Sequence, residues 1–192
     1  MRRSGNIFLF AGLLLVLGSF GLLAATTLQT NTAASAAAEL ATELEDAMPP
    51  RSDGLMDSYT NMEMPAISLD GQDFIGTIAV PAFQTVLPIA SAWDTGKVSS
   101  FPCRFWGTVY DGSLILGGAD QKGQFDFLDQ IQNGDSVLVT DMTGAQFSYR
   151  VSAIHRADSA RADILLDGQS DLTIFARNAR SLEYIIVRCM MG

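Results

Sequence analysis

The sequence offers few side chains for nucleophilic catalysis. It contains one histidine, His155, and two cysteines, Cys103 and Cys189. An imidazole activates a thiol only within hydrogen-bond reach, and this histidine has no cysteine near it in the chain, so a Cys-His dyad is a poor candidate. We therefore expect His155 to be a surface or strand-end residue. One histidine and two separated cysteines also lack the spacing of metal ligands, so no metal or other cofactor is expected.

The end of the chain, over 171–189, predicts two strands joined by a tight connection. Residues 172–175 and 184–187 are runs of β-branched and apolar residues, and the polar residues 177–181 separate them. The connection carries two arginines, Arg177 and Arg180. This hairpin is the element around which the candidate site must be organised.

The hairpin resembles the C-terminal strand pair of the sortase family, especially the class D-like sortases of Gram-positive bacteria. In that family a strand of the form LTLFTC delivers a catalytic cysteine, and a strand of the form RVTVRC opens with a catalytic arginine. Without a gap, Ala176 and Arg177 take the places of Thr-Cys, and Tyr184 takes the place of the arginine. The catalytic histidine ends an earlier strand in an AGH motif, and the matching segment 113–120 has Ala119 there. The resemblance therefore implies that all three catalytic positions are substituted.

These substitutions remove the groups that the family's reaction needs. A sortase attacks a Thr-Gly peptide bond with its cysteine, holds a thioacyl intermediate and passes it to an amine. The guanidinium of Arg177 stays protonated and is no nucleophile, the alanine at 119 transfers no proton, and Tyr184 donates a hydrogen bond without positive charge. The resemblance thus implies a sortase fold without its catalytic residues. The remaining candidates for binding in the groove are Arg177, Arg180, Tyr184, Asp120 and His155.

The N-terminal residues have the pattern of a membrane anchor. Arg2 and Arg3 precede an apolar run over 7–26, and about 20 apolar residues span a hydrocarbon core. The arginines predict that 1–6 is cytoplasmic, so that the protein crosses the cell membrane once and its domain is extracellular. A cleaved signal peptide is the alternative, because 34–36 reads Ala-Ser-Ala, but this site lies far beyond the apolar run, which favours an anchor.

Residues 27–66 are expected to form a helical stalk and linker. The alanine-rich segment 33–47 has no helix breaker and ends before two prolines. A narrow apolar stripe on this helix consists of Ala37, Leu40, Ala41 and Leu44. The stripe could pair with a neighbouring helix, but so short a helix makes a weak seam, which favours a semi-rigid stalk. Residues 51–65 lack periodicity and are expected to be a flexible linker.

Residues 67–192 are expected to form one domain of mainly β structure. Segments at 74–81, 85–90, 113–118, 134–141 and 146–151 are candidate strands, and 124–131 has helical spacing. Residues 102–107 read Pro-Cys-Arg-Phe-Trp-Gly, which resembles a further sortase motif. The resemblance implies an eight-stranded mixed β-barrel with short helices, in which the connection 156–170 lines a peptide groove.

The two cysteines are expected to form a disulfide. Both follow the predicted anchor, their number is even, and the barrel topology implied by the resemblance puts Cys103 and Cys189 at one end, away from the reaction centre. Two free thiols are the alternative, since a bridge requires Cα atoms within about 7 Å.

The formal net charge of −9 argues against binding to a nucleic acid backbone. Three functions remain. We favour a membrane-anchored, catalytically inactive pseudo-sortase that binds a peptide sorting signal, a surface protein or a cell-wall component. The second is an active sortase-type cysteine transpeptidase with rearranged catalytic residues that attaches surface proteins to the cell wall. The third is a scaffold for pilus or secretion assembly that uses the anchor and the helix more than the groove.

Overall fold

The computed structural model describes residues 35–48, 63–158 and 162–192. The predicted cytoplasmic segment 1–6 and the predicted anchor 7–26 lie outside these residues, as does most of the linker predicted over 51–65. Among the residues that are described, no helix is both long enough and apolar enough to cross a membrane. The described part is therefore the predicted domain and one helix before it.

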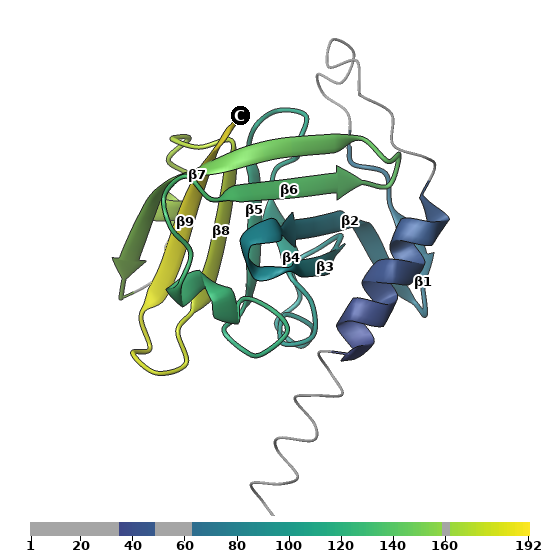
Figure 1. Cartoon of the computed structure of the whole chain (residues 1–192), viewed down its shortest axis with the longest axis horizontal. Helices are drawn as coiled ribbons and strands as arrows, with labels where there is room; N and C mark the ends of the chain where they lie inside the picture. The colour runs from purple at the N-terminus through teal and green to yellow at the C-terminus, as the bar shows by residue number, and fades with distance from the viewer. Residues whose placement is uncertain (1–34, 49–62, 159–161) are drawn as a thin grey trace, which may run out of the picture.

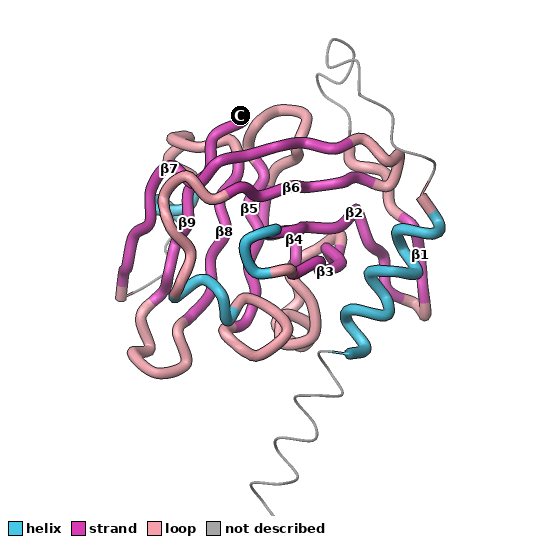
Figure 2. The backbone as a smooth tube through the Cα atoms, in the orientation of Figure 1, coloured by secondary structure: helices cyan, strands magenta, loops and turns pink. Residues whose placement is uncertain are grey.

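Within the described residues, nine strands form one continuous sheet (Figure 1, Figure 2). In chain order they are β1 (Ile67–Leu69), β2 (Gln72–Val80), β3 (Thr85–Ala90), β4 (Cys103–Trp106), β5 (Leu114–Ala119), β6 (Ser136–Asp141), β7 (Gln146–Ala157), β8 (Leu172–Arg177) and β9 (Tyr184–Met191). Three short helices are η2 (Pro81–Phe83), η3 (Asp126–Asp129) and α2 (Ala162–Leu165). Burial alternates along the first half of β7, as expected for a strand with one face on a core.

The sheet closes into a barrel. The strand order is β1-β2-β3-β4-β5-β8-β9-β7-β6, and β6 also pairs with β2. The strands β2 to β9 therefore form a closed ring of eight, and β1 is an additional short strand on β2. The pairs β3–β4 and β5–β8 are parallel and the other pairs are antiparallel. The predicted eight-stranded mixed barrel is confirmed, whereas β1 was not predicted.

Closure of the barrel depends on Gly76 in β2. The register between β2 and β3 shifts next to this residue, and its φ is +154°. A Cβ atom at this position would lie only 2.1 Å from the backbone oxygen of Thr140 on β6. Only glycine therefore allows β6 to approach β2 closely enough to pair with it.

Alternate residues of the strands face opposite sides of the barrel wall. Leu116 and Ile174 belong to the main cluster in the interior. Their neighbours in the chain, Ile115 and Phe175, belong to a smaller apolar cluster on the outside, which also contains Leu165 of α2. The outer faces of β5, β8 and β9 are thus apolar and are partly covered by connecting segments.

The helix predicted before the domain forms over 35–47. Ala37, Ala41 and Leu44 of its stripe are buried. Leu44 contacts a barrel cluster that includes Phe74 and Phe101, and Figure 1 shows the helix beside β1. The segment predicted as a semi-rigid stalk therefore lies against the barrel, because its stripe packs on apolar residues there.

The predicted disulfide is contradicted, since Cys103 and Cys189 are both free and buried. Cys103 on β4 pairs with Gly117 of β5, and Cys189 on β9 pairs with Leu172 of β8. Gly117 in turn pairs with Phe175 of β8, three residues beyond Leu172, so the two cysteines differ in level by roughly 10 Å along the strands at about 3.3 Å per residue. This exceeds the span of a disulfide. The assumption that the two cysteines share one end of the barrel was wrong.

Candidate functional site

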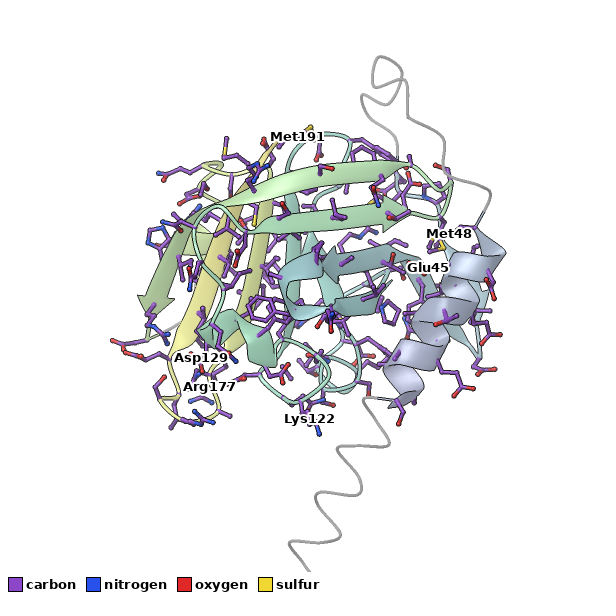
Figure 3. The ribbon with its side chains drawn as sticks, in the orientation of Figure 1. Glu45, Met48, Lys122, Asp129, Arg177 and Met191 are labelled. Atoms are coloured by element: carbon purple, nitrogen blue, oxygen red, sulfur yellow. The ribbon has the colours of Figure 1, made fainter. Side chains whose placement is uncertain are left out.

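Three residues on neighbouring strands form one row at an end of the barrel. Ala119 at the end of β5 pairs with Arg177 at the end of β8, and Arg177 pairs with Tyr184 at the start of β9. Since adjacent strands lie about 4.8 Å apart, the three are immediate neighbours. Figure 3 shows Arg177 at the same end of the molecule as Asp129. The structure thus brings together the three positions that the sortase resemblance assigned to one reaction site.

Two glycines in β5 allow aromatic rings to lie directly on the strand. A Cβ atom on Gly117 would lie 2.3 Å from Cζ3 of Trp93 and 2.6 Å from Cζ of Phe175. A Cβ atom on Gly118, which faces the other side, would lie 2.4 Å from Cδ2 of Phe125. The Gly-Gly pair therefore makes room for rings on both faces of the strand next to Ala119.

The rings on the outer face form an aromatic cluster. Trp93 stacks on Phe175 with ring centroids 5.7 Å apart. Phe105 of β4 meets both rings edge to face at 5.5 and 5.6 Å. Tyr184 lies 6.5 Å from Phe175 at a tilted angle. Each aromatic pair of this kind stabilises the fold by about 0.5–1.5 kcal/mol beyond the burial of apolar area. The cluster therefore forms a rigid apolar side of a binding site.

A pocket of about 410 Å³ opens beside this cluster. We call it the row pocket, and its lining residues are Trp93, Val98, Phe105, Gly118, Ala119, Asp120, Phe175, Arg177 and Tyr184. Most of these residues are apolar or aromatic, and the charged side chains are Asp120 and Arg177. Such a site suits an apolar ligand group that also offers polar atoms at one end.

Arg177 is exposed at the pocket, and its Nε donates a hydrogen bond to the carbonyl oxygen of Leu182 at 3.0 Å. This bond fixes the plane of the guanidinium, and the described residues accept no further hydrogen bond from its terminal nitrogens. Of the described residues that line the row pocket, none carries a thiol or an imidazole. The arrangement can therefore bind an acceptor group, but it lacks the thiol and the imidazole that the family's reaction uses.

The two thiols are kept from reaction by burial. Desolvation raises the pKa of the Cys189 thiol to about 12. Desolvation also raises the pKa of Cys103, although a backbone hydrogen bond opposes the shift. Since the thiolate is the reactive form, both shifts lower the fraction of each cysteine that can react at neutral pH.

The connection between β8 and β9 is held by Asn178, a residue that the sequence did not single out. Its Nδ2 donates to Oδ2 of Asp129 at 2.6 Å, and its Oδ1 accepts hydrogen bonds from the N–H groups of Arg180 and Ser181. Asp120 accepts a hydrogen bond from the N–H of Ala179 at 2.8 Å. The connection is therefore ordered by short polar contacts, and Asp120 has a structural role in it. The side chain of Arg180 is exposed and does not line the row pocket.

His155 does not reach the row pocket. It lies on β7 opposite Ile186 of β9, so β9 separates it from β8, and it is exposed. The position of His155 therefore does not support a role in the groove. It agrees with the expectation that His155 is a surface residue of a strand. Among the described residues, no three His, Cys, Asp or Glu side chains are grouped so that they could hold a metal ion.

A buried arginine fixes the connection between β7 and β8. The side chain of Arg188 on β9 donates from both terminal nitrogens to the carboxylate of Asp167, and it donates to the carbonyl oxygen of Ile164 at 2.8 Å. These hydrogen bonds lower the pKa of Asp167. The pair holds α2 against the outer face, where Leu165 packs on Phe175. The sequence showed acidic residues in this connection but gave no partner for them.

Comparison with known families identifies the domain. The family model of the sortase domain matches residues 78–185. These residues include the whole row of Ala119, Arg177 and Tyr184. None of the curated proteins matches the chain.

Solved structures of sortases share the fold. Streptococcus agalactiae sortase C1 in complex with MTSET is 16% identical over 84% of this chain and 89% of that chain, with a TM-score of 0.56. Sortase A from Corynebacterium diphtheriae is 18% identical over 85% and 84% of the two chains, with a TM-score of 0.54. The Clostridium perfringens Sortase D5 transpeptidase is 22% identical over 62% of this chain and 79% of that chain, with a TM-score of 0.53. At these identities the likeness shows the fold and does not extend to activity.

Proposed function

Because the chain belongs to the sortase family, we propose that it is a pseudo-sortase, which binds a peptide in the row pocket and does not cleave it. The observation that carries the proposal is the composition of the row. Ala119, Arg177 and Tyr184 are paired neighbours at the mouth of an apolar pocket. They offer a guanidinium and a phenol for hydrogen bonding, and neither group can attack a peptide bond.

The binding mode follows from the chemistry of the pocket. An apolar side chain of the peptide packs against the rings of Trp93, Phe105 and Phe175. The free N–H groups of Arg177 donate to a peptide carbonyl or to a terminal carboxylate, which is a charge-assisted hydrogen bond. In this arrangement Arg177 occupies the place of a nucleophile and stabilises the bound ligand instead.

The setting of the domain is part of the same proposal. Residues 7–26 anchor the chain in the cell membrane, residues 1–6 are cytoplasmic, and the domain is extracellular. The apolar run and the arginines before it support this orientation. The partner is then the sorting signal of a surface protein, and the domain assists the attachment or assembly of that protein at the cell wall.

The proposal is tested with a labelled sorting peptide that contains a Thr-Gly bond. Binding is measured by fluorescence anisotropy, and cleavage is measured in parallel by mass spectrometry. We expect binding without cleavage, and we expect Arg177→Ala to weaken binding at least about tenfold because a charge-assisted hydrogen bond contributes about 1.5–3 kcal/mol. Arg180→Ala is the matched control, since that side chain does not line the pocket, and it should change affinity less than twofold.

Cleavage by the unmodified chain, abolished by replacement of Cys103 or Cys189, would instead support a cysteine transpeptidase with rearranged residues. Equal peptide affinities for the unmodified chain and Arg177→Ala would remove Arg177 from the binding site.

A further inference from the structure

A second pocket adjoins the row pocket. It also measures about 410 Å³, and it shares the rings of Trp93 and Phe105 with the row pocket. Its lining residues are Glu63, Ser91, Ala92, Trp93, Arg104, Phe105, Trp106, Gly107, Thr108 and Asp111. The two pockets together form an extended surface with Trp93 and Phe105 between them.

Both tryptophans of the chain line this second pocket and both are exposed. The exposed fraction is 37% for Trp93 and 58% for Trp106. Indole rings are large apolar groups that proteins usually bury, and exposed rings gathered at one place are typical of interaction sites. The rings also have π faces, which attract cations.

Among the described residues that line the second pocket, one carboxylate has no cation beside it. Arg104 is neutralised, because its Nη1 lies 3.1 Å from Oε2 of Glu63, and its Nε donates to the carbonyl oxygen of Ser91 at 2.8 Å. Asp111 lies in the loop after β4. The groups that donate hydrogen bonds to its carboxylate, the N–H of Thr108 and the N–H and hydroxyl of Ser113, are uncharged.

The carboxylate of Asp111 is held in a fixed position. Its Oδ1 accepts hydrogen bonds from the N–H groups of Thr108 and Ser113 at 3.3 and 3.0 Å and from the Ser113 hydroxyl. Partial burial opposes ionisation, but these hydrogen bonds outweigh it and lower the pKa of Asp111. The group is therefore ionised at neutral pH, and the described residues give its Oδ2 no hydrogen-bond partner.

We propose that the pocket of Trp93, Trp106 and Asp111 binds a basic side chain, lysine or arginine, of the peptide that occupies the row pocket. Exposed indole rings beside a carboxylate provide both a cation–π contact and a salt bridge. Arginine binds more tightly than lysine, since its planar guanidinium stacks on an indole and is less strongly hydrated. The formal net charge of −9 also favours cationic partners. That the cation is carried by this peptide rests on the proposed function, whereas the recognition of the cation does not.

The test uses two small probes of nearly the same size and shape, one charged and one neutral. Nα-acetyl-L-arginine amide carries the guanidinium, and Nα-acetyl-L-citrulline amide is its neutral counterpart. Because the chain has two tryptophans, the indole N–H resonances of the full chain in detergent micelles, labelled with ¹⁵N-tryptophan, report on this pocket directly. We expect the arginine probe to shift both resonances in a saturable manner and to bind at least about fivefold more tightly than the citrulline probe.

Variants separate this site from the row pocket. Asp111→Asn and Trp106→Ala should each weaken binding of the arginine probe at least about fivefold, and added NaCl should weaken it for the unmodified chain. Arg177→Ala, which alters the row pocket alone, should leave the probe's affinity unchanged. If the unmodified chain binds the arginine probe but does not bind the sorting peptide, the proposed function is rejected and this site is retained.

Equal shifts with the arginine and citrulline probes, or no shift with either, would overturn the proposal. A neutral oligosaccharide such as chitotriose provides a second way to overturn it. If chitotriose shifts both indole resonances independently of salt while the arginine probe binds weakly, the pocket is a carbohydrate site.

Discussion

Replacement of Asp167 by asparagine should release the connection that covers the outer face of the barrel. The change leaves the guanidinium of Arg188, whose side chain is 7% exposed, without a negative partner. Breaking a buried ion pair costs about 3–5 kcal/mol. The side chain of Asp167 is itself 23% exposed. We therefore expect Asp167→Asn to lower the free energy of unfolding by about 2–3 kcal/mol.

Arg188→Met should lower the free energy of unfolding less than Asp167→Asn does. It removes the buried charge and keeps an apolar side chain of similar length, and the carboxylate left behind reaches water. Urea denaturation gives the free energy of unfolding for each variant, and amide hydrogen exchange over residues 162–171 shows whether the loss is local. Asp158→Asn is the matched control on the same connection, because Asp158 is exposed, and it should stay within about 0.5 kcal/mol.

The same pair gives a pH dependence. Its hydrogen bonds lower the pKa of Asp167 below the ordinary value of 3.8. Because the pKa of Asp167 is lower in the folded state, the pair contributes its full share to the free energy of unfolding above the ordinary pKa of 3.8. That share is lost as pH falls through the folded-state pKa. Exchange protection of 162–171 should therefore persist from pH 7 to pH 5 and fall below about pH 4. If the Asp167→Asn variant is as stable as the unmodified chain and its amide exchange protection over 162–171 is unchanged, the ion pair of Asp167 and Arg188 does not hold this connection.

Three further predictions concern the site wall, the helix and the thiols. Gly117→Ala should displace the Trp93 ring, because the added Cβ would lie 2.3 Å from it; tryptophan fluorescence should shift and peptide affinity should fall several-fold, and an unchanged spectrum would contradict this. Leu44→Ala should destabilise the chain by about 2–3 kcal/mol in urea denaturation because the side chain is fully buried, whereas the exposed Glu43→Ala should change stability by less than about 0.5 kcal/mol. Cys103 and Cys189 should resist iodoacetamide in the native state and react after denaturation; rapid native alkylation would show that the thiols are accessible.

The terminal hairpin and the alignment of Ala119, Arg177 and Tyr184 in one row could be predicted from the sequence. The two runs at 172–175 and 184–187 have strand composition, and the gap-free match fixed the register of Arg177 and Tyr184. Once both strands were placed, their pairing put the two residues opposite each other. Strand register was thus the physical property that carried this part of the prediction.

The remaining features depend on contacts between distant segments, which no local pattern encodes. The disulfide prediction failed because the offset between β4 and β9 depends on every strand between them. The partner of the helix stripe was not predicted, because it is a barrel surface that includes Phe101. The ion pair of Asp167 and Arg188 joins residues on different elements, and neither residue is unusual by itself. Burial and partner choice were therefore visible only in the folded chain.

The central claim is that the row binds a peptide where a sortase would cleave one. The most direct test incubates a sorting peptide with the unmodified chain and, in parallel, with the A119H/R177C/Y184R variant, which installs the family's histidine, cysteine and arginine. Mass spectrometry then detects cleaved peptide or a thioacyl adduct. We expect neither product from the unmodified chain and a detectable product from the variant. A cleaved peptide or an adduct formed by the unmodified chain would contradict it.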